Sequence, residues 1–233
     1  MPLLPDPRHG SRSRGFTLIE MIVVISVIAI LVGIVVPNFV ASRAIANEAA
    51  IVGTLRTLTT AEHKFRQMGL VDVDKDSMNE FGTLTEMCGY AAMRGTTEHL
   101  APTVLSLRFS AVDARGWMSD HGYYVALYLP DATGLGLPEK PASIPSYDPK
   151  LSADYFTIVA WPMTAGGNSG RATYFVNQQN DILKCDLGGY AGATKVPNAG
   201  CALIGAADDK HIDSQQLAVN ANGADGNRWV PVH

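Results

Sequence analysis

The apolar residues of this chain are concentrated near its N-terminal end. An apolar stretch runs from Phe16 to Val36, and Glu20 is the one charged residue within it. At about 1.5 Å per helical residue, this stretch extends roughly 30 Å, which matches the hydrocarbon thickness of a bilayer. Positive charge keeps the flanking end of a membrane helix in the cytoplasm, so the rest of the chain is expected to be exported. The basic residues before the stretch are Arg8, Arg12 and Arg14.

Helical periodicity continues beyond the membrane stretch. Apolar or small residues recur three or four positions apart from Ala41 to Phe65, and charged residues fall mostly elsewhere around the turn. Gly69 then follows as a helix stop. The pattern predicts one helix over residues 16–68. Its second half, residues 37–68, is amphipathic and needs a sheet to cover its apolar stripe.

Short runs of aromatic and β-branched residues follow in the second half of the chain. Such runs are typical of strands, and the polar residues between the last two runs favour a hairpin. Because the runs come after one long helix, the predicted fold class is α+β, with the helix packed on an antiparallel β-sheet. Residues 84–117 have a mixed pattern and are expected to form a loop-rich connection with a short helix. The predicted strands are 123–129, 155–161, 172–176 and 182–185.

Composition excludes several classes of function. The formal net charge is −4, whereas general nucleic-acid-binding proteins usually carry a basic face, so no nucleic-acid partner is expected. The sequence has no zinc-protease, phosphate-loop or nucleophile-elbow motif, and we do not expect an enzyme. An enzyme tethered by an uncleaved signal anchor remains an alternative, but the membrane segment is the only feature that supports it.

The residues at the start of the apolar stretch carry a family resemblance. Arg14 to Glu20, RGFTLIE, resembles the class III leader of type IV pilins and type II secretion pseudopilins. The resemblance implies a leader of residues 1–15, which a membrane aspartyl peptidase removes by cutting after Gly15. It also implies N-methylation of the new first residue, Phe16.

The resemblance further implies a structural subunit of a type IV pilus or pilus-like fibre, polymerised through its N-terminal helix. The alternatives are a type II secretion pseudopilin and a minor tip pilin that acts as a binding module. The chain is long for a major subunit, so a minor pilin stays an alternative. In this interpretation residues 16–36 form the transmembrane and assembly half of the helix. Residues 69–233 form a pilin-like β-sheet domain with a C-terminal loop and tail, in the periplasm or outside the cell.

The same resemblance implies partners and a location. The partners are identical or related pilin subunits, a prepilin peptidase and methyltransferase, an inner-membrane assembly platform, and inner-membrane lipid before assembly. The chain is expected to cross the bacterial inner membrane once, with its N-terminus in the cytoplasm and its C-terminus in the periplasm. It then passes into the fibre.

Glu20 has a physical role in this interpretation. A carboxylate in a membrane helix costs roughly 2.5–3.5 kcal/mol on insertion scales and is usually retained for a function. Cleavage after Gly15 creates an α-ammonium on Phe16, close to this carboxylate in sequence. In a helical bundle, Glu20 of one subunit can neutralise the ammonium of its neighbour. This pairing favours one axial register, because other registers leave two buried charges unpaired.

Two residues in the middle of the helix are expected to weaken it. Pro37 lacks a backbone donor and Gly33 has a low helix propensity, so the sequence predicts a kink or a loosened turn. Members of the resembled family often have proline at this place, where the helix can melt on packing into a fibre. The sequence leaves both interpretations open.

Alternating carboxylates follow the predicted helix. Asp72, Asp74 and Asp76 offer hard oxygen ligands at a spacing that suits calcium, and Glu80 is a fourth candidate ligand. Lys75 reduces the attraction for a cation, and the segment departs from the EF-hand pattern. A solvated acidic loop is the alternative. No other cofactor is expected.

The chain has three cysteines, and export places them in an oxidising compartment. Many type IV pilins have a C-terminal disulfide loop, so the resemblance implies a bond between Cys185 and Cys201. Closing a loop of about 15 residues stabilises by roughly 3 kcal/mol in the chain-entropy model. Cys88 is then expected to be buried as a small apolar residue, although pairings that include it stay open.

Overall fold

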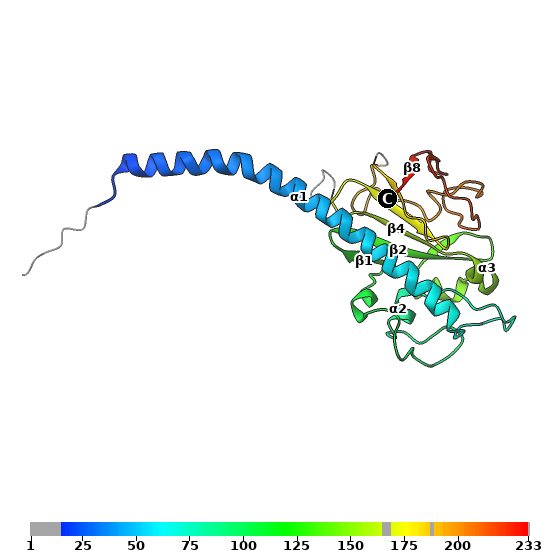
Figure 1. Ribbon diagram of the computed structural model, residues 1–233. Coiled ribbons are helices and arrows are strands. Elements are labelled where there is room, and N and C mark those ends of the chain that lie inside the picture. The colour runs from blue at the N-terminus through cyan, green and yellow to red at the C-terminus, as the bar shows by residue number, and fades with distance from the viewer. Residues whose placement is uncertain (1–14, 165–168, 187–188, 233) are drawn as a thin grey trace, which may run out of the picture. The chain divides into compact units, whose positions relative to one another are not determined.

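The chain folds as one long helix and an antiparallel β-sheet (Figure 1). It divides into two compact units, residues 1–40 and 41–233, and helix α1 (Leu18–Gln67) contributes to both. The predicted helix over residues 16–68 and the predicted α+β class are therefore confirmed. The computed structural model describes residues 15–164, 169–186 and 189–232.

In the described part of the first unit, the helix is exposed on all sides. Every residue from Gly15 to Phe39 is exposed to solvent, although most of them are Ile, Val, Leu or Met. By length and composition, α1 can cross a membrane in this part. No residue of its most apolar window is buried within the described chain.

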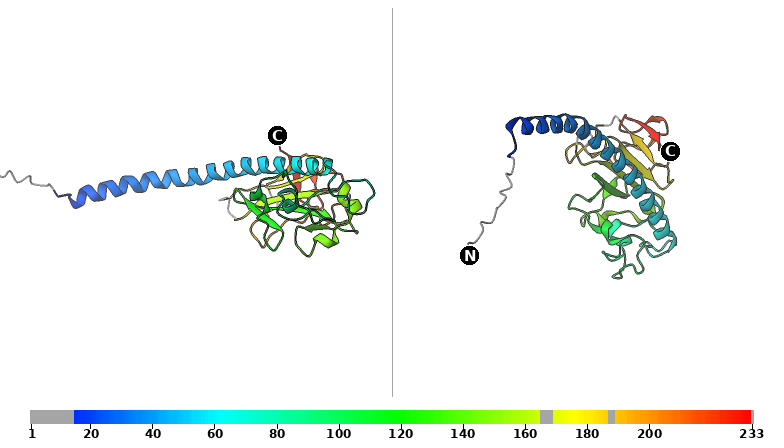
Figure 2. Two further views of the ribbon diagram at one scale, coloured as in Figure 1. Left: turned by 90° about the horizontal axis from the view of Figure 1, so that it is seen from below. Right: turned by 60° about the vertical axis from the view of Figure 1, so that its left-hand side comes forward.

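In the second unit, the same helix packs against the sheet. Figure 1 shows this part of α1 in cyan, across strands β1, β2 and β4, and Figure 2 shows it lying along the domain in both views. The buried residues recur three or four positions apart, as expected for one face of a helix. They are Ala44, Ile51, Thr54, Leu55, Leu58, Thr59, Ala61, Glu62 and Phe65.

All strand pairs among the described residues are antiparallel, and the order across the sheet is β1-β2-β4-β5-β6-β8-β7, with β3 also paired to β2. The four predicted strands correspond to β2, β4, β5 and β6 and are confirmed. The bounds are β1 Trp117–Asp120, β2 Tyr123–Pro130, β3 Gly136–Pro138, β4 Thr157–Pro162, β5 Thr173–Asn177, β6 Leu183–Cys185, β7 Ala221–Asn222 and β8 Arg228–Pro231.

Both faces of the sheet are buried, because alternate residues of each strand enter different cores. In β2, Val125, Leu127 and Leu129 join the core beneath α1, whereas Ala126 and Tyr128 join a second core on the opposite face. The C-terminal part of the chain covers this second face. Its buried side chains in this core include Cys201, Leu203, Ile212 and Trp229.

The predicted C-terminal tail of the domain returns to the sheet. Strand β8 pairs with β6, with Leu183 opposite Pro231, and β7 pairs with β8. Trp229 is fully buried at the centre of β8. The burial of Trp229 therefore holds against the sheet a segment whose other residues are mostly polar.

The connections contain short helical elements. Helix α2, which lies in the connection expected to hold a short helix, begins at Thr83 with a capping box in which the side chains of Thr83 and Glu86 bond each other's backbone amides. The bounds are α2 Leu84–Met87, η1 Leu107–Ser110, η2 Ile144–Ser146 and α3 Pro149–Asp154.

Candidate functional site

The predicted cleavage position lies just before helix α1. Gly15 and Phe16 are both exposed, Phe16 by 69%, and neither is part of the helix. A peptidase needs an accessible backbone outside regular secondary structure, and this bond meets that requirement. The remaining predicted leader, residues 1–14, lies outside the described residues.

Glu20 closes the first turn of α1 through reciprocal hydrogen bonds with Thr17. Its Oε2 accepts a bond from the backbone N–H of Thr17 at 2.8 Å and one from the Thr17 hydroxyl at 2.7 Å. The Glu20 amide donates to Thr17 Oγ1 at 3.2 Å. This is the geometry of a capping box, in which two side chains satisfy amides that the helix leaves without partners. Oε1 of Glu20 has no hydrogen-bond partner among the described residues.

The turn around Glu20 also forms a shallow apolar hollow. The hollow has a volume of about 300 Å³ and is lined by Phe16, Ile19, Glu20, Val23 and Val24. The side chain at the predicted new N-terminus therefore lies on the same surface as the carboxylate.

Gly33 and Pro37 lie within α1, whose helical assignment is unbroken from Leu18 to Gln67. Pro37 therefore does not end the helix. A Cβ added to Gly33 would meet nothing within 4 Å, so this glycine is not required by packing within the described residues. The loosening of the helix at these positions on packing into a fibre stays a prediction.

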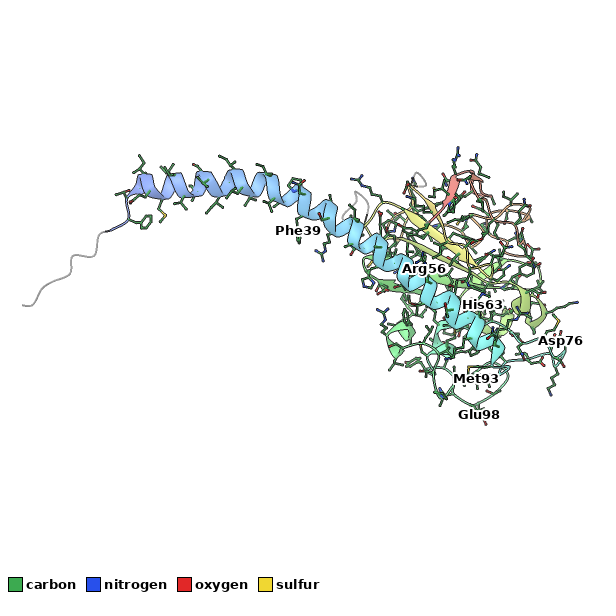
Figure 3. All side chains as sticks on the ribbon, in the orientation of Figure 1. Phe39, Arg56, His63, Asp76, Met93 and Glu98 are labelled. Atoms are coloured by element: carbon green, nitrogen blue, oxygen red, sulfur yellow. The ribbon has the colours of Figure 1, made fainter. Side chains whose placement is uncertain are left out.

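Three of the four candidate calcium ligands lie together. One carboxylate oxygen from each of Asp72, Asp74 and Asp76 lies within 4.8 Å of the others, in the loop where Figure 3 labels Asp76. Two of these side chains also hold the turn, because Asp72 accepts bonds from the amides of Asp76 and Ser77, both at 3.1 Å, and Asp76 accepts one from a following amide. Calcium binding by these three residues stays a prediction.

Glu80, the fourth candidate, does not join the three aspartates. It is 2% exposed and pairs with Arg94, whose Nη1 lies 3.0 Å from Glu80 Oε2. The other oxygen of Glu80 accepts a bond from the amide of Val73 at 2.9 Å. Sequence spacing suggested a loop ligand, but the fold uses this carboxylate as a buried anchor for the loop.

Arg94 is at the centre of a buried charge cluster that the sequence did not predict. Its Nε lies 3.1 Å from Glu86 Oε1, and its side chain also donates to the backbone oxygen of Phe81. The side chains of Arg94, Glu80 and Glu86 are 7%, 1% and 3% exposed, respectively. The cluster ties the loop after α1 to helix α2.

Two further glutamates are buried close to this cluster. Glu62 of α1 accepts a bond from the Gly82 amide at 2.9 Å through Oε2, whereas its buried Oε1 has no partner among the described atoms. Glu139 accepts bonds from the amides of Leu84 and Thr85 at the start of α2. Burial raises the pKa of both carboxyls, and that of Glu62 lies well above its usual range. The arrangement favours a protonated Glu62.

The predicted disulfide between Cys185 and Cys201 is not formed, and the described residues contain no disulfide. The fold does bring both residues into the core on the sheet face opposite α1. Burial raises the pKa of the Cys201 thiol well above its usual range, so the neutral thiol packs there as a small apolar group. Cys88 is buried in the other core as predicted. Burial raises its pKa to about 11.

Comparison with known proteins finds one family model and two relatives. The family model described as the prokaryotic N-terminal methylation motif matches residues 10–36. The type IV major pilin protein PilA of Myxococcus xanthus is 34% identical over 88 residues, which are 38% of this chain and 36% of that protein. The type IV wide pilus major component PilA4 of Thermus thermophilus is 35% identical over 68 residues, 29% of this chain and 49% of that protein. No solved structure matches.

These matches confirm the resemblance to type IV pilins that the residues from Arg14 to Glu20 suggested. The chain spans 36% and 49% of the length of the two relatives.

Proposed function

We propose that this chain is a structural subunit of a type IV pilus or pilus-like fibre, cleaved after Gly15, N-methylated on Phe16 and polymerised through α1. Its homologues are type IV major pilins, and it carries the N-terminal methylation motif, both of which support a pilin structural subunit. The observation that carries the proposal is the first part of α1. It exposes apolar side chains on every side and has one carboxylate, Glu20.

An apolar helix of this length needs an apolar surrounding. A soluble monomer rarely exposes a contiguous apolar patch of more than a few hundred Å². Here exposed apolar side chains make up nearly all of the segment from Met21 to Val36, in which Ser26 is the one polar residue. Lipid supplies the surrounding before assembly, and the helices of neighbouring subunits supply it within a fibre. The same surface thus serves first as membrane anchor and then as interface.

Glu20 provides the register of that interface. In the precursor, the capping box with Thr17 uses Oε2 and leaves Oε1 without a partner among the described residues. A carboxylate accepts hydrogen bonds at both oxygens. The α-ammonium that cleavage creates on a neighbouring subunit's Phe16 can therefore bind Oε1 without displacing the cap. This pairing neutralises two charges that would each be costly in an apolar bundle.

The proposal includes location and partners. The chain crosses the inner membrane once, with the basic N-terminal side in the cytoplasm and the β-sheet domain in the periplasm. Its partners are a prepilin peptidase and methyltransferase, an assembly platform in the inner membrane, and identical or related subunits. Because the named relatives are major pilus components, we favour a pilus over a secretion pseudopilus.

The test separates the charge of Glu20 from its role as a cap. Glu20→Val removes both, Glu20→Gln keeps a cap acceptor and removes the charge, and Thr17→Ala removes the two cap bonds of the hydroxyl and keeps the charge. We expect all three precursors to insert and to be cleaved. Sheared fibres should contain Thr17→Ala, whereas both Glu20 variants should be absent from them, as judged by immunoblot and electron microscopy.

Two results would contradict the proposal. Fibres of normal abundance from Glu20→Gln would exclude the charge pairing. An exported chain whose N-terminal residue, read by mass spectrometry, is not a methylated Phe16 would exclude the processing step. The relative abundance of the chain in sheared fibres distinguishes a major from a minor subunit.

A further inference from the structure

A groove lies on the domain beside the edge of strand β2. Strand β4 pairs along one edge of β2, so β1 and β3, which also pair with β2, follow each other along its other edge. Where β1 begins and β3 ends, residues 196–199 of the C-terminal segment approach them and enclose a volume of about 310 Å³. This is at the lower end of the range for small-ligand pockets.

The groove is positively charged although the chain is acidic overall. Its lining includes Arg115, Lys140 and Lys210 and no Asp or Glu among the described residues. Arg115 is paired with Asp113 at 2.6 Å, but neither lysine forms an ion pair within the described structure. Two lysines therefore face the groove outside any ion pair of the described structure, while the carboxylate of Asp209, next to Lys210 in the sequence, accepts a bond from Asn198 Nδ2 at 2.8 Å. Such a local field attracts small anions.

One wall of the groove is apolar and held in place by packing. Trp117 meets Trp161 edge to face, with 4.9 Å between the ring centroids, and the Arg115 guanidinium lies 4.2 Å from the centroid of the Trp117 ring. Tyr128, which is 6% exposed, and Pro138 complete the wall from β2 and β3. Aromatic and proline side chains lose little conformational entropy on binding, so the wall is preorganised.

We propose that this groove binds a small acidic sugar. The ring packs against the wall formed by Trp117 and Pro138, and the anionic group lies between Lys140 and Lys210. A groove of about 310 Å³ has room for one or two sugar rings but not for an extended acyl chain. The overall negative charge disfavours a long nucleic acid, whose phosphates would also meet the acidic remainder of the surface. This site lies in the β-sheet domain and does not depend on polymerisation.

The anionic group can come from two sources, and the experiment separates them. Full-length protein in a polyoxyethylene detergent, which carries no sugar, is titrated with glucuronate, with glucose 6-phosphate and with glucose. Tryptophan fluorescence and NMR report binding. We expect saturable binding of at least one acidic sugar and at least about tenfold weaker binding of glucose, because the charge supplies the recognition. Binding of glucuronate alone identifies a carboxylate as the ligand group, and binding of glucose 6-phosphate alone identifies a phosphate.

Variants locate the site. The double variant Lys140→Gln with Lys210→Gln should weaken binding about tenfold or more, and Trp117→Leu should abolish the fluorescence change. Lys150→Gln is the matched control, because Lys150 is exposed on α3 and lies outside the groove. This variant should bind the acidic sugar as tightly as the unaltered chain does.

Several outcomes would overturn the proposal. Equal binding of glucose, unchanged binding by the double lysine variant, or no saturable binding of either acidic sugar up to about 10 mM would each exclude it. Inorganic phosphate that binds as tightly as glucose 6-phosphate would show that the ring is not recognised. A short oligonucleotide that binds at these lysines while the sugars do not would assign the groove to nucleic acid instead.

Discussion

The two parts of helix α1 differ in what surrounds them. Up to Phe39 every described residue is exposed, whereas beyond Val40 one face of the same helix is buried against the sheet. The glutamates follow the same division. Glu20 is exposed and its Oε2 accepts hydrogen bonds from its own first turn, whereas Glu62 is fully buried and its Oε1 has no hydrogen-bond partner among the described residues.

This difference shows which part of the molecule is complete by itself. The domain buries its apolar side chains in two cores, on both faces of one sheet. The first part of the helix has the composition of a core but no covering layer within the described chain. Its apolar side chains therefore contribute to stability only once lipid or other subunits cover them.

The largest effect is expected from the buried charges of the domain. Arg94→Met leaves the carboxylates of Glu80 and Glu86 buried without their cation, and should lower the free energy of unfolding by about 3–5 kcal/mol. Chemical unfolding of the full chain in detergent, followed by tryptophan fluorescence, measures this loss.

The control is an exposed ion pair of the same domain. Lys184 and Asp186 lie 3.3 Å apart with side chains 38% and 55% exposed. Asp186→Asn should change stability by less than about 1 kcal/mol. Equal losses from the two variants would show that the Arg94 cluster does not anchor the loop after α1.

A second prediction compares the same substitution in both parts of one helix. Leu55 is fully buried and Leu31 is 56% exposed. Leu55→Ala should destabilise the domain by about 2–5 kcal/mol, because it removes buried methyl groups and leaves a cavity. Leu31→Ala should change the unfolding of the domain by less than about 0.5 kcal/mol. A comparable loss from Leu31→Ala, measured under the same conditions, would mean that the first part of α1 also packs within the monomer.

The smallest effect concerns pH. Burial raises the pKa of Glu62 above its usual 4.5, so above that pH the folded state holds a proton that the unfolded state releases. The free energy of unfolding should therefore decrease as pH rises from about 4.5 toward the folded-state pKa. Glu62→Gln should flatten this decrease, because the amide does not ionise. Thermal unfolding of both proteins between pH 5 and pH 8 measures the slope.

Part of that slope should remain in the variant, since burial also raises the pKa of Glu80 and Glu139. Three other carboxyls, those of Asp113, Asp131 and Asp208, accept hydrogen bonds and have lowered pKa values. Their contribution to the free energy of unfolding is lost only at more acidic pH. A stability that rises with pH in this range would contradict the assignment of a protonated Glu62.

The elements that could be predicted are those with a strong local pattern. Helix α1 and strands β2, β4, β5 and β6 consist of long apolar or aromatic runs, and each lies within two residues of its predicted bounds. Strands β1, β3, β7 and β8 are two to four residues long and contain polar residues, glycine or proline, so no periodicity identified them. The short strands β1 and β8 form because they pair with other strands of the sheet, and β8 also because Trp229 is buried.

The sequence by itself determined the N-terminal segment of this protein. The apolar length, the junction of Gly15 and Phe16 and the capping pair of Thr17 and Glu20 lie within one short window, where hydropathy and helix geometry act locally. Tertiary structure decided the rest. The partner of Glu80, the packing of Cys185 and Cys201 in one core, and the meeting of Lys140 and Lys210 at one groove depend on the order of strands in the sheet. That order is set by which apolar faces can be buried together, a property of the whole domain.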